Sequence, residues 1–272
     1  RRELGNDKRI RAFFEKLIML MRNKVLLNKG DLAQTRVIWF YPSSMKIARK
    51  ASLERTWNEL FNQYFNPTNS TTGISESLAP FYYFRNKNII QGAYKPVVTI
   101  DIGGGTTDLV VFRQNMPMLM SSFKFAANTI FGDGYSEFGA ASSNGIISKY
   151  YPHYEKLLDI NKLFNLKKVL ETIKGKNKTE DLNAFFFSIE NNSNIVDKRL
   201  FSYNELLAND EDLKILFIYF YSAIIYHVAE LMHHKGIEKP KHLVFSGTGS
   251  KILNIITSDL KILSKLSKII FE

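Results

Sequence analysis

The octet Asp101-Ile-Gly-Gly-Gly-Thr-Thr-Asp108 sets three consecutive glycines between two carboxylates and two hydroxyls. Short β-branched runs flank it, Pro96-Val-Val-Thr-Ile100 before it and Leu109-Val-Val-Phe112 after it, so the glycines join two strands of a hairpin. Glycine permits positive φ and lets backbone N–H groups converge on an anion without a Cβ in the way. The pattern predicts a phosphate-binding loop in preference to a plain turn.

The polar side chains of the octet favour the same interpretation. Thr106 and Thr107 offer hydroxyl donors to phosphate oxygens. Asp101 and Asp108 either hold Mg²⁺ through water molecules, because this cation dehydrates reluctantly, or brace the loop. The chain has no G-x-x-x-x-G-K-[ST] motif and no helix directly after the glycines, so neither a Walker loop nor a dinucleotide fingerprint fits. A metal–nucleotide site in a different fold is predicted.

The composition indicates a packed globule, with 272 residues, 45% hydrophobic and 13% aromatic. The absence of cysteine excludes disulfides, thiolate metal sites and cysteine nucleophiles, and favours a cytoplasmic protein. The net charge of +11 is compatible with nucleic acid, an anionic membrane surface or an acidic partner. Because lysines occur throughout the chain and are not gathered on one element, we expect no nucleic-acid role.

The first part of the chain has the pattern of a helix followed by a β-α step. Residues 10–28 carry apolar side chains at helical spacing. Residues 35–41 form an apolar run typical of a buried strand, and a helix then extends to about Tyr64. Ser43 or Ser44 can cap that helix.

The second part predicts two further strands, an insert and a long apolar helix. Strands are expected at 118–127 and 241–245. The lysine-rich residues 151–211 indicate a small inserted subdomain, in which the aromatic trio 185–187 is interpreted as a strand. The apolar segment 215–232 approaches the length of a membrane span, but tyrosines, a histidine and a glutamate interrupt it. We therefore predict a helix buried between protein layers and no membrane span.

The order of elements over residues 35–252 resembles the superfamily of actin, the heat-shock chaperone ATPases and the sugar kinases, with the chaperone and bacterial-actin branches most similar. The octet matches the second phosphate loop of that family almost letter for letter. The resemblance implies an α/β, actin-like ATPase (ribonuclease H-like) fold of two lobes with an inserted small subdomain. It places a partial first lobe, including the hairpin, at 1–113 and the second lobe at 114–272, with the insert at about 151–211.

Two departures from the family pattern imply an incomplete first lobe. The first phosphate hairpin of the family, Asp-x-Gly-x-x-x-[Thr/Ser], has no counterpart before Val37. The C-terminal helix that returns to the first lobe has no counterpart after Ile252. We therefore expect a piece of a longer bacterial protein, or one that has lost hydrolysis.

The resemblance also assigns roles to individual residues. It places Asp101 near Mg²⁺, through water, and near the attacking water, and Glu76 as the residue that positions that water. The other nucleotide contacts that it implies come from three loops: Gly103, Gly104, Gly105, Thr106, Thr107, Asp108, Gly132, Asp133, Gly247, Thr248, Gly249 and Ser250. Each loop also has an ordinary interpretation. Glu76 suits the first turn of a helix capped by Ser75, 132–134 is a plain turn, and 247–250 is a strand-to-helix connection.

These expectations define three functions. The first is a nucleotide switch that binds ATP or ADP with Mg²⁺ inside a larger protein and has an unidentified protein partner, with ATP hydrolysis left open. The second is an actin-like filament or assembly scaffold in which hydrolysis is weak or absent. The third is a small-molecule kinase, for which the sequence contains no sugar-binding signature.

Overall fold

The computed structural model describes residues 2–43, 45–65, 71–87, 94–114, 116–132, 144–175 and 179–272. The chain divides into two compact units, unit 1 from Arg1 to Lys87 and unit 2 from Asn88 to Glu272. Both hairpin strands belong to the sheet of unit 2, and the lobes at 1–113 and 114–272 stay a prediction.

Unit 1 consists of helices around a two-stranded parallel sheet. Its elements are α1 (Arg2–Leu27), β1 (Val37–Tyr41), α2 (Ile47–Tyr64), β2 (Thr71–Ser75), η1 (Glu76–Leu78) and α3 (Ala79–Asn86). The strands pair in register from Val37 opposite Thr71 to Tyr41 opposite Ser75. The strand and helix predicted at 35–64 are confirmed, and β2 lies where the sequence marked a strand only weakly.

The core of unit 1 lies between α1 and α2. Ile18 of α1 packs with Trp57, Leu60 and Phe61 of α2, and all four are buried. The ring of Phe14 meets Trp57 edge-on, with 5.3 Å between ring centroids. The apolar spacing of the first helix thus forms a buried face as predicted, although the helix begins near residue 2 and not at residue 10.

The predicted cap of α2 is wrong where it can be judged. The helix begins at Ile47 after Lys46, which makes no side-chain capping bond. The hydroxyl of Ser43 instead bonds to that of Ser75, 2.5 Å away. Ser75 in turn provides no side-chain cap to η1. Ser44 lies outside the described residues.

Unit 2 is built on a four-stranded sheet in the order β5-β4-β3-β6. The strands are β3 (Val97–Ile102), β4 (Thr107–Arg113), β5 (Met116–Phe123) and β6 (His242–Ser246). β4 is antiparallel to β3 and to β5, whereas β6 is parallel to β3. All four strands follow the sequence prediction, except that β5 begins two residues earlier than predicted and ends at Phe123.

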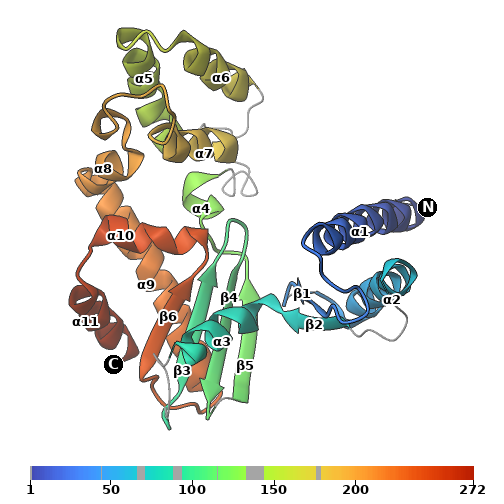
Figure 1. Ribbon diagram of the computed structural model, residues 1–272. Helices are drawn as coiled ribbons and strands as arrows, with labels where there is room; N and C mark the ends of the chain where they lie inside the picture. The colour runs from blue at the N-terminus through green and yellow to red at the C-terminus, as the bar shows by residue number, and fades with distance from the viewer. Residues whose placement is uncertain are drawn as a thin grey trace. The chain divides into compact units, whose positions relative to one another are not determined.

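Helices make up the rest of unit 2 (Figure 1). They are α4 (Asn128–Phe131), α5 (Gly145–Ile160), α6 (Phe164–Gly175), α7 (Thr179–Ile189), η3 (Arg199–Phe201), α8 (Tyr203–Ala208), α9 (Glu211–His234), η4 (Thr248–Lys251), α10 (Ile252–Ile256) and α11 (Leu260–Phe271). Helices α5 to α8 pack on one another as a helical subdomain in the region predicted as an insert. The predicted strand at 185–187 is wrong, because α7 buries Leu182, Phe186 and Ile189 at helical spacing.

The long apolar helix predicted at 215–232 is α9. Its buried residues, which include Phe217, Ile224 and Val228, join the core cluster of unit 2 with Val98 and Ile100 of β3. By length and composition α9 also suffices to cross a membrane, and 39% of its most apolar 18-residue window is buried in the protein. Packing in the core explains why one side of α9 is apolar. The absence of a membrane span stays a prediction.

The positive charge is concentrated in unit 1. Unit 1 has 16 Lys and Arg against 7 Asp and Glu, a net charge of +9, whereas unit 2 has 21 against 19, a net charge of +2. The basic residues are therefore less evenly distributed than predicted. Since the glycine hairpin belongs to unit 2, the net charge of its own unit contributes little attraction for an anion.

The core role of α9 predicts a contrast between two isoleucines. Ile224 is fully buried and Ile215 is 54% exposed on the same helix. Ile224→Ala is expected to lower the free energy of unfolding by about 2–5 kcal/mol, because the site cannot collapse around the lost atoms. Ile215→Ala is the matched control and is expected to change it by about 0.5 kcal/mol or less. Urea unfolding measures both, and equal losses would contradict this packing.

Candidate functional site

The glycine hairpin brings the two acids of the octet together. Strands β3 and β4 pair Asp101 with Asp108 across the ladder, so both side chains lie on one face of the sheet. The turn between the strands is closed by the N–H of Gly103, which donates to the carbonyl of Thr106 at 3.0 Å. Gly104 and Gly105, at the tip of the turn, are exposed. The predicted hairpin is thus present, with its glycines accessible.

Main-chain N–H groups at the start of helix α4 donate hydrogen bonds to two carbonyl groups of the hairpin turn. The N–H of Ala127 donates to the carbonyl of Gly103 at 3.1 Å, and the N–H of Asn128 donates to that of Gly104 at 2.8 Å. In a trans peptide the N–H points opposite to the carbonyl, and the described chain has no cis bond. The N–H groups of Gly104 and Gly105 therefore both point away from α4.

These amides are the free donors of the turn. Across the described residues, the N–H groups of Gly104, Gly105 and Thr106 have no hydrogen-bond partner. A Cβ added to Gly105 would meet nothing within 4 Å, so the space above the tip is open. Successive free amides on a glycine turn form a concave donor surface that suits phosphate oxygens.

A second glycine loop packs directly on the hairpin. Parallel pairing of β3 with β6 sets Ser246 beside Asp101, so the loop 247–250 starts where the hairpin turn starts. Gly247 has φ +82, and a Cβ there would lie 2.3 Å from the carbonyl oxygen of Ile102. A Cβ on Gly249 would lie 2.8 Å from the same oxygen. The two loops predicted to share a ligand are thus in contact, and only glycine permits this approach.

The two carboxylates of the hairpin have different surroundings. Asp101 is partly exposed, and its Oδ2 accepts a hydrogen bond of 2.8 Å from the hydroxyl of Ser246. Asp108 is buried, and its Oδ1 has no hydrogen-bond partner among the described residues. Burial raises the pKa of Asp108, a hydrogen bond from Ser122 opposes the rise, and the charge of Asp101 adds to it. Asp101 is therefore the carboxylate that a ligand can reach.

Two hydroxyls predicted to face a ligand bond to the protein main chain. Thr107 is fully buried, and its hydroxyl donates to the carbonyl of Phe125 at 2.6 Å. The hydroxyl of Ser250 donates to the carbonyl of Gly247 at 2.7 Å. The first bond ties β4 to the segment after β5 and the second lies within the loop after β6, and the predicted contacts of Thr107 and Ser250 with a ligand stay predictions. Thr106 and Thr248 keep their side chains partly or fully exposed.

The remaining predicted site residues belong to other segments of the chain. Gly132 follows α4, where a Cβ would lie 3.0 Å from Oε1 of Glu180. Asp133 lies outside the described residues. Glu76 is exposed at the start of η1 in unit 1, and its part in positioning water stays a prediction.

Sequence reasoning missed two residues at the edge of the hairpin. The side-chain amide of Asn128 donates to Oε1 of Glu180 at 3.2 Å, which links α4 to the first turn of α7. The oxygen of the same amide, Oδ1, lies 3.1 Å from the position of a Cβ on Gly104. The two residues are 52 positions apart, and no local pattern pairs them. An acidic first turn on α7 is the only trace of Glu180 in the sequence.

The donor set allows a metal ion only together with a ligand. Within the described ranges no three His, Cys, Asp or Glu side chains form a group that could hold a metal ion. Mg²⁺ prefers six oxygens and keeps several waters, so one carboxylate such as Asp101 with phosphate oxygens and water completes its shell. The site therefore fits a metal–phosphate complex better than a bare cation.

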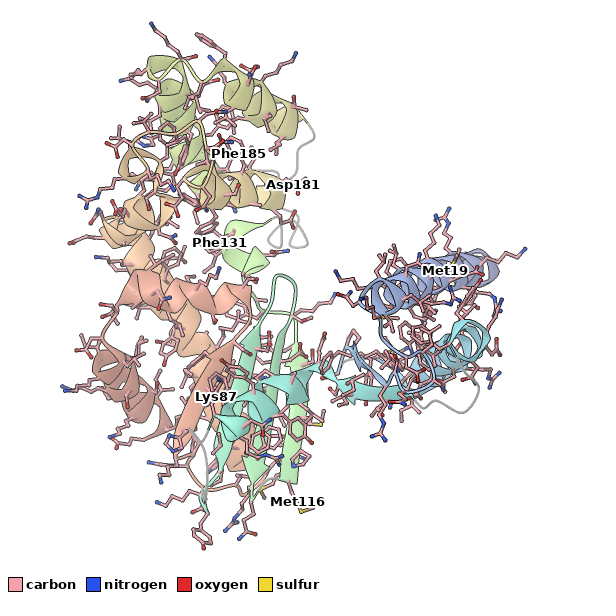
Figure 2. All side chains as sticks on the ribbon, viewed as in Figure 1. Met19, Lys87, Met116, Phe131, Asp181 and Phe185 are labelled. Atoms are coloured by element: carbon pink, nitrogen blue, oxygen red, sulfur yellow. The ribbon has the colours of Figure 1, made fainter. Side chains whose placement is uncertain are left out.

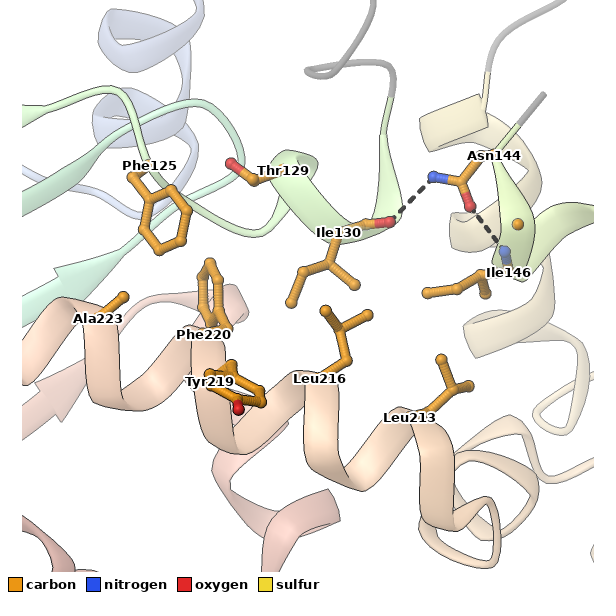
Figure 3. A pocket seen from close by; sticks show the side chains of 11 residues that line it. Phe125, Thr129, Ile130, Asn144, Ile146, Leu213, Leu216, Tyr219, Phe220 and Ala223 are labelled. Carbon is orange, nitrogen blue, oxygen red and sulfur yellow. Dashed lines mark hydrogen bonds between the residues drawn. The ribbon is translucent and has the colours of Figure 1, made fainter. Parts of the chain in front are cut away.

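An apolar cavity of about 580 Å³ lies nearby in unit 2 (Figure 3). Leu216 and Phe220 of α9 line one side, and Phe125, Ile130 and Ile146 line the other. Its lining among the described residues is mainly apolar and aromatic, with Thr129 and Asn144 as the polar side chains apart from Tyr219. The glycine hairpin remains the candidate site.

The chain matches no protein-family profile and no curated protein sequence. Among solved structures, MreB5 of Spiroplasma citri bound to ADP is similar over 50% of this chain and 38% of its own, with 19% identity and a TM-score of 0.34. An archaeal actin homolog is similar over 42% of this chain and 41% of its own, with 15% identity and a TM-score of 0.27. The Ppx/GppA family member of Aquifex aeolicus is similar over 57% and 46%, with 12% identity and a TM-score of 0.29.

The matches span less than half the length of each of these chains. The contacts of the two glycine loops, and not this likeness, carry the function proposed below.

The contact between the loops predicts unequal effects of two glycine substitutions. Gly247→Ala would place a methyl group against the Ile102 carbonyl at a positive φ, and is expected to cost about 2–5 kcal/mol of unfolding free energy. Gly236 also has positive φ, +64, but has nothing within 4 Å of its Cβ position. Gly236→Ala is therefore expected to cost only about 1–2 kcal/mol. Equal costs in urea unfolding would show that the loop contact is absent.

Asp108 predicts a pH dependence of stability. Its pKa is raised in the folded state, so the folded protein keeps this proton to higher pH than the unfolded chain does. The free energy of unfolding therefore falls as the pH rises from about 4 through the folded pKa. Asp108→Asn should unfold at a higher temperature than the wild type near about pH 8 and lose this advantage near about pH 3.5. A variant no more stable than the wild type at the higher pH contradicts this assignment.

Proposed function

We propose that this chain is an adenine-nucleotide-binding module of a larger protein, with Mg²⁺ accompanying the phosphates. The observation that carries the proposal is the packing of loop 247–250 on the glycine hairpin, beside amides that point away from α4. A nucleotide has an anionic end and a flat apolar end, and the two loops offer one surface suited to each. Open main-chain donors suit the phosphates, and the exposed Gly247 and Thr248 leave the main chain of the second loop open to a flat base.

The residues of the chain have separate tasks in this proposal. The amides of Gly104, Gly105 and Thr106 bind the terminal phosphates. Asp101 holds the hydrated Mg²⁺, and the Ser246 hydroxyl orients its carboxylate. When bound, the metal neutralises phosphate charge. Since main-chain dipoles provide the binding, the site does not need the basic residues of unit 1.

ATP hydrolysis is a further step of the same proposal. Glu76 is assigned to orient the attacking water, as the family resemblance implies. A switch that only binds ATP and ADP works without this step, because a conformation that binds one nucleotide better is enough to shift the equilibrium.

A filament or assembly scaffold is the second candidate. Ile38 and Phe40 are 61% and 54% exposed on one face of β1, while Trp39 between them packs inward. Exposed apolar side chains on a strand favour contact with another protein surface. Sedimentation of the chain with and without Mg-ATP separates the two candidates, because pelleting that depends on nucleotide requires assembly.

The binding proposal is tested by calorimetric titration of the chain with ATP and ADP, with Mg²⁺ or with EDTA. Asp101→Asn is expected to weaken Mg-ATP binding about tenfold or more, or about 1.4 kcal/mol. EDTA should weaken ATP binding to the wild type more than to this variant. Asp181→Asn makes the same charge change at an exposed position and should bind as the wild type does. Failure of the wild type to bind either nucleotide overturns the proposal.

A further inference from the structure

Helix α4 lies between the glycine hairpin and the helical subdomain. On one side its amides hold the carbonyls of Gly103 and Gly104. On the other side it packs beside α7, as the labels of Phe131 on α4 and Asp181 and Phe185 on α7 show (Figure 2). No other described element has hydrogen bonds to both the hairpin turn and α7.

Asn128 makes both of these connections. Its main-chain N–H donates to Gly104 at 2.8 Å, and its side-chain amide donates to Glu180 at 3.2 Å. The carboxylate of Glu180 is thereby held near Gly132, where a Cβ would lie 3.0 Å from its Oε1. A second tie fixes the same two helices, because the amide of Asn183 donates to the carbonyl of Phe131.

We propose that Asn128 is a positioning residue that couples occupancy of the glycine hairpin to the placement of α7. This inference rests on the proposed function. A phosphate bound by the N–H groups of Gly104 and Gly105 polarises the peptides whose carbonyls Ala127 and Asn128 hold, and hydrogen bonds in such a chain strengthen one another. Anion binding therefore strengthens the hydrogen bonds between the hairpin turn and the start of α4. Through its side-chain bond, Asn128 then fixes the position of Glu180 on α7.

The negative charge of Glu180 determines whether the link strengthens or weakens binding of an anionic ligand. A carboxylate beside a phosphate loop repels the ligand unless a donor holds and partly neutralises it. Asn128 is that donor, so loss of its side-chain amide frees the carboxylate of Glu180, while the main-chain bond from Asn128 to Gly104 remains. The effect is largest for the nucleotide with the most phosphate charge at the hairpin, which is the triphosphate.

The cavity of unit 2 leaves α4 room to respond. Thr129 and Ile130, which follow Asn128 on α4, border the cavity of about 580 Å³ (Figure 3). Protein interiors are normally close-packed and resist small shifts. The open space on this side of α4 lets the helix shift when the hairpin binds or releases a ligand.

The test uses the whole chain and compares AMPPNP with ADP. Asn128→Ala and Asn128→Asp are expected to weaken AMPPNP binding about three- to tenfold, and ADP binding less, because a hydrogen bond to a charged group is lost. Asn128→Asp combined with Glu180→Gln restores a donor–acceptor pair with reversed roles, so it should recover most of the AMPPNP affinity. Asp181→Asn, in the same turn of α7, serves as the charge control.

Hydrogen exchange distinguishes coupling from a local effect. In the wild type, AMPPNP should protect amides of both the hairpin and the first turns of α7. In Asn128→Ala only the protection of α7 should be lost. Binding by the wild type with unchanged α7 protection in Asn128→Ala overturns this inference alone. Absence of nucleotide binding by the wild type overturns it together with the proposed function.

Discussion

The candidate site depends on one contact, the approach of Gly247 and Gly249 to the end of β3. A methyl group at either position would come within 2.8 Å of the Ile102 carbonyl oxygen. The parallel pairing of β3 with β6 fixes the two strand ends side by side, and the missing Cβ atoms let the loops that follow touch. Only because they touch can one ligand reach the free amides of the hairpin and the loop after β6.

The local parts of this arrangement were predictable from the sequence, and the contacts between distant parts were not. The hairpin follows from β-branched runs around three glycines, a pattern confined to 96–112. The pairing of Asp101 with Ser246 joins residues 145 positions apart, and only the family resemblance anticipated that the two loops meet. The link between Asn128 and Glu180 has neither a local pattern nor a family motif behind it, and it was missed.

The errors have physical causes that recur along the chain. The run Phe185-Phe-Phe187 is apolar at every position, so it does not distinguish a strand from a helix; only its partners decide, and Leu182 and Ile189 place it on a helix. The hydroxyls of Thr107 and Ser250 lie next to turns and donate to main-chain carbonyls, as hydroxyls in such positions readily do. The nucleotide contacts that the resemblance implies for these two residues stay predictions.

The two acids of the octet are the same residue type, and the strand register gives them different surroundings. Both carboxylates lie on the same face of one ladder pair. Asp101 lies beside Ser246 of β6, whereas Asp108 lies beside Ser122 of β5. Two like charges so close are unfavourable, and burial of one of them favours its protonated form. Asp101 is then the more exposed carboxylate of the pair, at the strand end beside the free amides. In the proposed function, a hydrated divalent cation between Asp101 and a polyphosphate would relieve the repulsion that an anionic ligand meets there, so phosphate would bind best together with the metal.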